Sequence, residues 1–147
     1  GFIGSPTMNF MKTEIRGVQD DSVTVGLPGG GAITVPVKPG KCRAGDKVTL
    51  GVRPEHLLEG GGGDGELRGV VLVVERLGGA TYCYLQLEGD TTLTAEVGGN
   101  SHVRVGERLA LGVSLETCHL FDADGVALEQ TERHLLADLG RDRATAH

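Results

Sequence analysis

The sequence predicts an all-β fold, a closed or nearly closed barrel of about nine short strands with few helices. Apolar residues recur at every second position in short runs, which is the period of a half-buried strand. The 25 Gly and 5 Pro among 147 residues separate these runs. A closed sheet is the arrangement that hides the unpaired edges of so many short strands.

The first half of the chain contains three predicted strands. Residues 22–27 alternate Val or Leu with Ser, Thr and Gly, and residues 32–37 alternate Ile or Val with Ala, Thr and Pro. Pro28 with Gly29 marks a hairpin between the two runs. The run "KVTLGV" at 47–52 places its apolar residues on one face.

The second half repeats this pattern. Residues 66–78 form a long predicted strand, and its middle, residues 70–74, is apolar on both faces. The remaining predicted strands are 80–89, 91–97, 108–115 and a short last one at 118–122.

A Gly-rich segment divides the chain. Residues 59–66, "EGGGGDGE", are too rich in Gly to hold a strand cheaply and are expected to form a flexible linker or an exposed loop. We therefore expect a first β subdomain over 1–58 and a second over 67–127, packed side by side and exchanging strands. Residues 128–147 are expected to form a short helix, with Thr131 as its N-cap and Gly140 as its stop, or a disordered tail.

The composition limits the functional class. The net charge of −6 and the absence of basic clusters argue against a nucleic-acid surface. No apolar run approaches the length of a membrane helix, and the first six residues do not resemble a signal peptide. The three cysteines, Cys42, Cys83 and Cys118, are widely spaced and form no CxxC pair. We therefore expect them to be free thiols that pack as small apolar side chains, in a cytosolic protein.

No catalytic, cofactor or metal residue is predicted. Lys41 lacks both the upstream Gly and the following Ser or Thr of a phosphate-binding loop. No Gly-x-Ser-x-Gly elbow occurs, and no pair of His shows the i, i+4 spacing of a helical metal site.

One stretch concentrates polar chemistry, "GVRPEHLL" at 51–58. Pro54 biases Arg53 toward an extended conformation, so a strand should end there at a sharp turn. One interpretation is structural, with Arg53 donating to carbonyls or to Glu55 and His56 satisfying a backbone group. The other is a surface for a partner or a small anion. No nucleophile lies near enough in sequence to favour catalysis.

Three stretches in this order carry a resemblance: "FIGSPTMNF" (2–10), "GVRPEHLL" (51–58) and "CHLFDADG" (118–125). Together with "VVERLGGATYCYLQL", they resemble the C-terminal regulatory domain of ATP-binding subunits from sugar-import ABC transporters, the MalK/UgpC group. The resemblance covers about residues 2–128.

The resemblance implies an OB-fold-like barrel of the TOBE class, related to MOP-type molybdate modules. A nucleotide-binding domain would precede residues 2–10 in the parent and would hold the ATP and Mg, so this chain itself would need no cofactor. The parent would drive uptake of a sugar or glycerol phosphate together with membrane subunits, on the cytoplasmic side of the cell membrane. The domain would be a homodimer contact and, in some members, a receiver of a regulatory protein.

Seven residues are candidate contacts for a partner or an anion. Arg53, Glu55 and His56 come from the polar stretch, and the others lie at expected barrel edges and turns: Phe10, Gly45, Gly69 and Glu75. A second hypothesis is a small-ligand module that senses an oxyanion or a sugar through Arg53 and His56. A free-standing enzyme is a third, weaker one.

Overall fold

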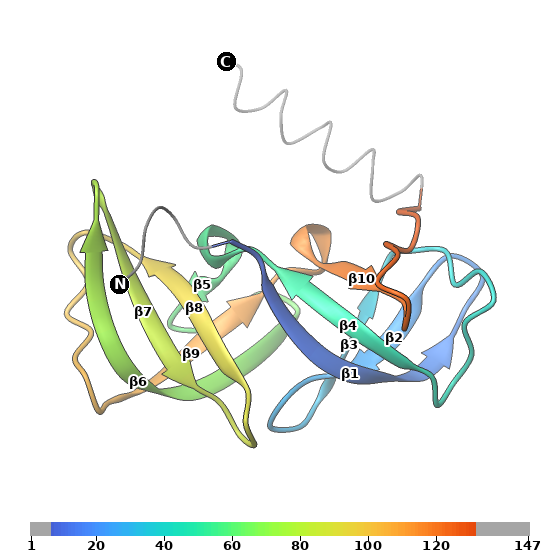
Figure 1. Cartoon of the computed structure of the whole chain (residues 1–147), viewed down its shortest axis with the longest axis horizontal. Coiled ribbons are helices and arrows are strands. Elements are labelled where there is room, and N and C mark those ends of the chain that lie inside the picture. The colour runs from blue at the N-terminus through green and yellow to red at the C-terminus, as the bar shows by residue number, and fades with distance from the viewer. Residues whose placement is uncertain (1–6, 132–147) are drawn as a thin grey trace, which may run out of the picture.

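The computed structural model describes residues 7–131 and shows two curled, five-stranded antiparallel sheets that lie side by side (Figure 1). The predicted all-β barrel-type fold is confirmed. Within the described residues, the only helical segments are two single 3-10 turns, η1 (Pro54–His56) and η2 (Leu115–Thr117). None of these residues forms a helix long and apolar enough to span a membrane.

The first sheet has the order β10-β4-β1-β2-β3. Its strands alternate buried and exposed side chains, as a sheet with one solvated face requires. The long β1 pairs with β4 over its first six residues and then with β2, with a bulge between Ile15 and Gly17. The strands are β1 (Asn9–Val18), β2 (Val23–Gly26), β3 (Ala32–Val35), β4 (Lys47–Val52) and β10 (His119–Phe121).

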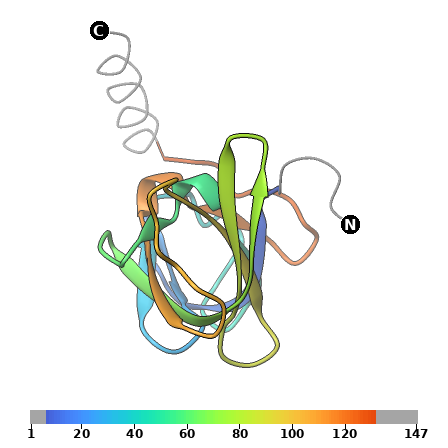
Figure 2. The same cartoon turned by 90° about the vertical axis from the view of Figure 1, so that its left-hand side faces the viewer.

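The second sheet has the order β5-β9-β6-β7-β8 and curls until its two edges approach each other (Figure 2). The Glu59 carboxylate at one edge accepts hydrogen bonds from the Gly98 N–H and the Ser101 hydroxyl beyond the other edge. These contacts help to close the barrel. The strands are β5 (Leu58–Glu59), β6 (Gly65–Leu77), β7 (Ala80–Gln86), β8 (Thr92–Val97) and β9 (Arg108–Val113).

One apolar cluster fills both sheets. Cys83 and Cys118 lie inside it as free thiols, as the sequence predicts, whereas Cys42 is only half-buried. Burial is the main reason why the pKa of the Cys83 thiol is raised to about 11 and that of Cys118 to about 12.

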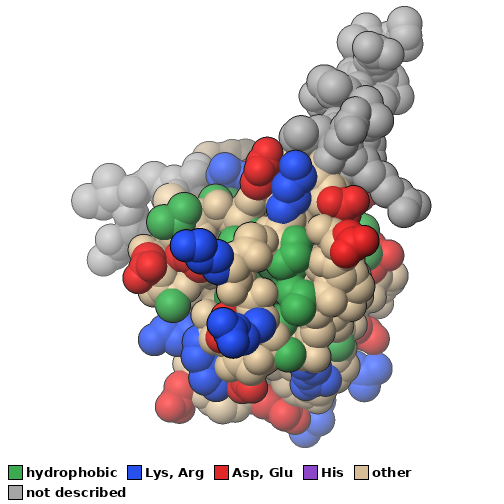
Figure 3. Space-filling view, turned by 90° about the vertical axis from the view of Figure 1, so that its right-hand side faces the viewer, with side chains coloured by type: hydrophobic (Ala, Val, Ile, Leu, Met, Phe, Trp, Pro, Cys, Tyr) green, Lys and Arg blue, Asp and Glu red, His purple; other side chains and the backbone are tan. Residues whose placement is uncertain are grey.

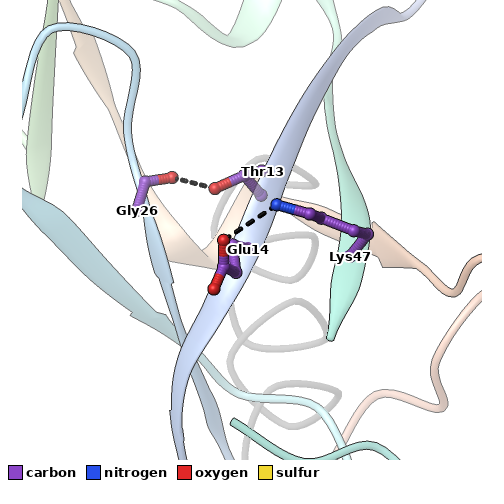
Figure 4. A network of polar contacts seen from close by, with 4 residues as sticks. All are labelled: Thr13, Glu14, Gly26 and Lys47. Atoms are coloured by element: carbon purple, nitrogen blue, oxygen red, sulfur yellow. Dashed lines mark hydrogen bonds and ion pairs between the residues drawn. The ribbon is translucent and has the colours of Figure 1, made fainter. Parts of the chain in front are cut away.

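Strand β1 is absent from the strands predicted above, because Lys12, Glu14 and Arg16 interrupt its apolar residues. Those charged side chains face solvent on the outer face. Figure 4 shows the contacts that join β1 to its two neighbours: the Thr13 hydroxyl donates to the Gly26 carbonyl at 2.6 Å, and Lys47 Nζ lies 2.9 Å from Glu14 Oε2.

The apolar run at 70–74 is mostly exposed. Val71 is buried, whereas Leu72 and Val73 are each 47% exposed. A bulge between Val71 and Val73 shifts the register, and β9 pairs with β6 only as far as Val70. The β6–β7 hairpin therefore projects beyond the rest of the sheet (Figure 1). Its apolar side chains near the bulge are exposed.

The segment between the predicted subdomains is partly regular. Glu59 ends β5 and Gly65 begins β6, while Gly60 to Gly63 take positive φ values in the turn between them. The last strand, β10, lies in the first sheet, beside β4. The subdomain boundaries stay a prediction. Of the predicted tail at 128–147, residues 128–131 are described and contain no helix, and Gln130 forms a β-bridge with Val37. The rest of the predicted helix or disordered tail, 132–147, lies outside the described residues.

Candidate partner-binding surface

The polar stretch forms a corner at the end of β4. Arg53 is extended (φ −75°, ψ 145°), Pro54 occupies the first position of η1, and the His56 N–H donates to the Arg53 carbonyl at 3.0 Å. Because Pro has no N–H to leave unpaired at this position, it starts the turn without loss of a hydrogen bond. The predicted strand end and turn are confirmed.

The charged side chains of this corner do not make the contacts expected of them. In the described part of the chain, no hydrogen bond or ion pair joins Arg53 to Glu55, and both residues are exposed. The His56 ring is half-buried, and its Nδ1 atom is buried with no hydrogen-bond partner among these residues. The backbone therefore makes the corner, and the side chains of Arg53 and Glu55 stay available at the surface.

Phe10 lies close to this corner. The residue is 60% exposed. In the β1–β4 pairing, Phe10 lies opposite Gly51, which precedes Arg53 by two residues. Its ring meets the ring of Phe121 edge to face, with 5.6 Å between centroids. A Cβ atom on Gly51 would lie 2.8 Å from the Phe121 ring, so this glycine provides the space in which the ring lies.

Gly45 lies at the other end of β4. It has φ +94°, which favours glycine, and its N–H donates to the Ile15 carbonyl at 2.8 Å. Gly51 lies six positions further along a nearly extended chain, a distance of about 20 Å. Gly45 and Phe10 therefore do not share one small contact site.

Gly69 and Glu75 belong to the second sheet. Gly69 is buried in β6, where a Cβ atom would lie 2.8 Å from the Gln86 carbonyl oxygen, so close strand packing requires a glycine there. Glu75 is half-buried beyond the bulge and opposite Tyr82. Burial and, next, the Glu75 carboxylate raise the pKa of the Tyr84 hydroxyl.

The structure thus gathers Phe10, Arg53, Glu55 and His56 at one end of the first sheet and leaves the other three apart. It also adds surface residues that the sequence reasoning missed. The partly exposed ring of Phe121 joins Phe10, and the outer half of β6 contributes an apolar stripe: Val70, Leu72, Val73 and Val74. Hydrophobic pattern alone cannot reveal such a stripe, because a strand buried on both faces has the same composition.

A groove lies beside β6. It is open to solvent and lies between the β2–β3 turn at Pro28 and the strands β6 and β9. Arg68 and Arg108 line it, together with Glu66, Glu88 and the backbone of Gly69. Arg68 lies 3.6 Å from Glu66, so part of its charge is already compensated.

Within residues 7–131, no group of three or more His, Cys, Asp or Glu side chains is placed to hold a metal ion. The face opposite the β6–β7 hairpin carries acidic and basic side chains side by side around a few apolar ones (Figure 3).

Comparison with known families identifies the kind of domain. The family model described as the MalK OB fold domain matches residues 4–57, and the TOBE domain model matches residues 50–121. The chain therefore belongs to the family of OB- and TOBE-type domains found in MalK-type ATP-binding proteins, as the resemblance implied.

Curated relatives agree. The maltose/maltodextrin import ATP-binding protein MalK of Vibrio cholerae is 39% identical over 140 residues, which are 95% of this chain and 38% of that protein. MalK of Vibrio vulnificus is 42% identical over 131 residues, or 88% of this chain and 35% of that protein. The chain thus spans less than two fifths of the length of these relatives.

The fold is shared with a solved structure. The crystal structure of the cytoplasmic molybdate-binding protein ModG, with molybdate bound, superposes with a TM-score of 0.68 at 19% identity. The match covers 80% of this chain and 95% of the ModG chain.

Proposed function

We propose that the chain is a non-catalytic regulatory and dimerisation domain of the ATP-binding subunit of a carbohydrate ABC importer. The parent protein would couple ATP hydrolysis to uptake of a sugar or glycerol phosphate, on the cytoplasmic side of the membrane and beside its membrane subunits. The observation that carries the proposal is the succession of the OB and TOBE matches over residues 4–121, with 39% identity to a MalK protein over nearly the whole chain.

The surface supports a role in protein contact. Phe10 and Phe121 expose aromatic area beside the uncompensated charges of Arg53 and Glu55, and interfaces are enriched in aromatic residues and Arg. The apolar stripe on β6 adds a second exposed area. In a homodimer related by a two-fold axis, each copy would present the same patch to the other.

Sedimentation velocity of the 147-residue chain over a range of concentrations tests dimerisation. We expect a concentration-dependent dimer. Phe10→Ser should weaken it if the aromatic surface forms the contact, and Leu72→Ser should weaken it if the apolar stripe on β6 does. Val18→Ser, which changes an exposed residue at the opposite end of β1 from Phe10, is the matched control and should leave the association unchanged. A chain that stays monomeric at the highest concentration would contradict dimerisation through this domain.

The absence of catalysis is tested directly. The chain alone, with ATP and Mg, should release no phosphate above the rate of a buffer blank. Measurable turnover would contradict the proposal and favour a free-standing enzyme.

A small-ligand module is the second candidate function. The shared fold with a molybdate-binding protein favours it, and the groove that contains Arg68 and Arg108 supplies cationic donors. Calorimetric titration with molybdate, sulfate, phosphate and maltose distinguishes the candidates. Saturable heat that disappears in Arg108→Ala would support sensing, whereas no heat at millimolar ligand would exclude it.

A further inference from the structure

The first residue of β1 makes two hydrogen bonds to the other sheet. Asn9 Nδ2 donates to the Thr94 carbonyl at 2.8 Å, and the Thr94 N–H donates to Asn9 Oδ1 at 2.8 Å. Asn9 is only 9% exposed, and Thr94 lies 85 positions later in the chain, in β8. Both polar groups of one carboxamide are therefore used on a single residue of the second sheet.

These bonds occupy the edge of a strand. β8 is the last strand of the second sheet and pairs only with β7 among the described strands, so its other side has free backbone groups. The Asn9 carboxamide presents one donor and one acceptor to Thr94, as a residue of a neighbouring antiparallel strand would. One side chain from the first sheet thus takes the place of a further strand.

The position of this contact gives it a mechanical role. The chain passes from the first sheet to the second after β4, through η1, and returns through η2 before β10. Two connections alone permit one sheet to rotate against the other about the line that joins them. A third attachment that lies off the line joining the two connections prevents this rotation. The hydrogen bonds of Asn9, at the start of β1, to Thr94 in β8 are such an attachment. Apolar packing between the sheets fixes their orientation less specifically than these hydrogen bonds do, because the hydrophobic effect is not directional.

We infer that Asn9 is a positioning residue that locks the two sheets in one orientation and ties the chain segment entering β1 to the second sheet. The lock itself is independent of the proposed function. If a nucleotide-binding domain precedes this segment, as that function requires, its movement would be transmitted to both sheets together.

Distance measurement between spin labels tests the lock. Labels on Ala32→Cys in β3 and Arg76→Cys in β6, both exposed, report the orientation of the sheets in the full chain with Cys42→Ser. The unaltered Asn9 should give a narrow distance distribution. Asn9→Ala should broaden it and shift its mean. Asn9→Asp, which keeps shape and volume but places an acceptor against the Thr94 carbonyl, should do the same.

Gln86→Ala is the matched control. Gln86 also uses its carboxamide on backbone carbonyls, those of Leu87, Gly89 and Thr91, but all of them lie within the second sheet and its turn. This variant should lose stability without any change in the distance distribution. An unchanged distribution in folded Asn9→Asp would overturn the inference.

Hydrogen exchange of the unaltered protein tests the lock without any variant. The Thr94 amide should exchange as slowly as amides in the middle of the sheet, because its partner holds it closed. Exchange at the rate of an exposed edge amide would also overturn the inference.

Discussion

The two longest strands, β1 and β6, use the same backbone device with different outcomes. Each pairs with one neighbour over its first half and with another over its second half, and each has a bulge just after this change of partner. At its bulge, β1 turns the charged Arg16 outward, whereas β6 turns Leu72 and, after the bulge, Val73 and Val74 into solvent.

The comparison shows that neighbouring chain, rather than composition, decides whether an apolar strand is buried. β6 is buried on its inner face where β9 accompanies it and becomes exposed where β9 stops. An apolar surface kept in solvent is a feature that folding alone does not favour, and it usually marks a contact site.

The largest expected effect compares two leucines of β6 on either side of the bulge. Leu67 is fully buried, so Leu67→Ala should lower the free energy of unfolding by about 2–5 kcal/mol. Leu72 is 47% exposed, so Leu72→Ala should change it by less than about 0.5 kcal/mol. Urea unfolding followed by circular dichroism measures both. Equal losses would mean that the outer half of β6 is covered in solution.

A smaller effect is expected at the glycine that lets β6 approach its neighbour. In Gly69→Ala, the new methyl group would press on the Gln86 carbonyl, which should cost about 1–3 kcal/mol of unfolding free energy. Gly99→Ala is the control, because no atom lies within 4 Å of its Cβ position. The difference between the two urea midpoints is the measurement, and its absence would contradict the close packing described here.

The buried thiols predict a loss of stability in alkali. In the folded chain, the pKa values of Cys83 and Cys118 are about 11 and about 12, above the value near 8.5 of an unfolded chain. The two thiols therefore hold their protons more tightly in the folded state than in the unfolded state. Their contribution to the free energy of unfolding is fully present below about pH 8.5 and is lost as the pH rises toward the pKa values of the folded chain.

Urea unfolding between pH 7 and pH 10 measures this dependence. The double variant Cys83→Ala with Cys118→Ala should flatten the alkaline slope, although its stability at pH 7 is lower. Cys42→Ala, at the half-buried thiol, should leave most of the slope intact. A slope unaffected by the double variant would assign the alkaline loss to other groups.

The smallest effect is expected at the ion pair on the outer face of β1. The hydrogen bond from Lys47, and then its charge, holds the pKa of Glu14 below its usual value. Its contribution is therefore present above the unfolded pKa and is lost as the pH falls through the folded one. Because both side chains are largely exposed, Glu14→Gln should shift the melting temperature only slightly at low salt and not at all at high salt. A shift that persists at high salt would contradict a solvent-screened pair.

Much of the fold could be predicted from period-2 patterns, since Val23, Val25 and Leu50 are buried where the alternation places them. The pattern did not identify β1, where Lys12, Glu14 and Arg16 take outward positions. It also did not reveal that the run at 70–74 is exposed, because a bulge changes the register there. In the candidate site, Pro54 predicted the corner. The Phe10–Phe121 contact joins residues 111 positions apart through the pairing of β1, β4 and β10, and no local pattern contains that information.

The place of β10 has a consequence for the order in which the molecule can be completed. β4 pairs with β1 on one side and with β10 on the other, and β10 is made only after the whole second sheet. During synthesis, the first sheet keeps an open edge at β4 until residue 121 has left the ribosome. A fragment that ends before His119 would expose that edge to other chains, so the first sheet depends for its protection on a strand made after the second sheet.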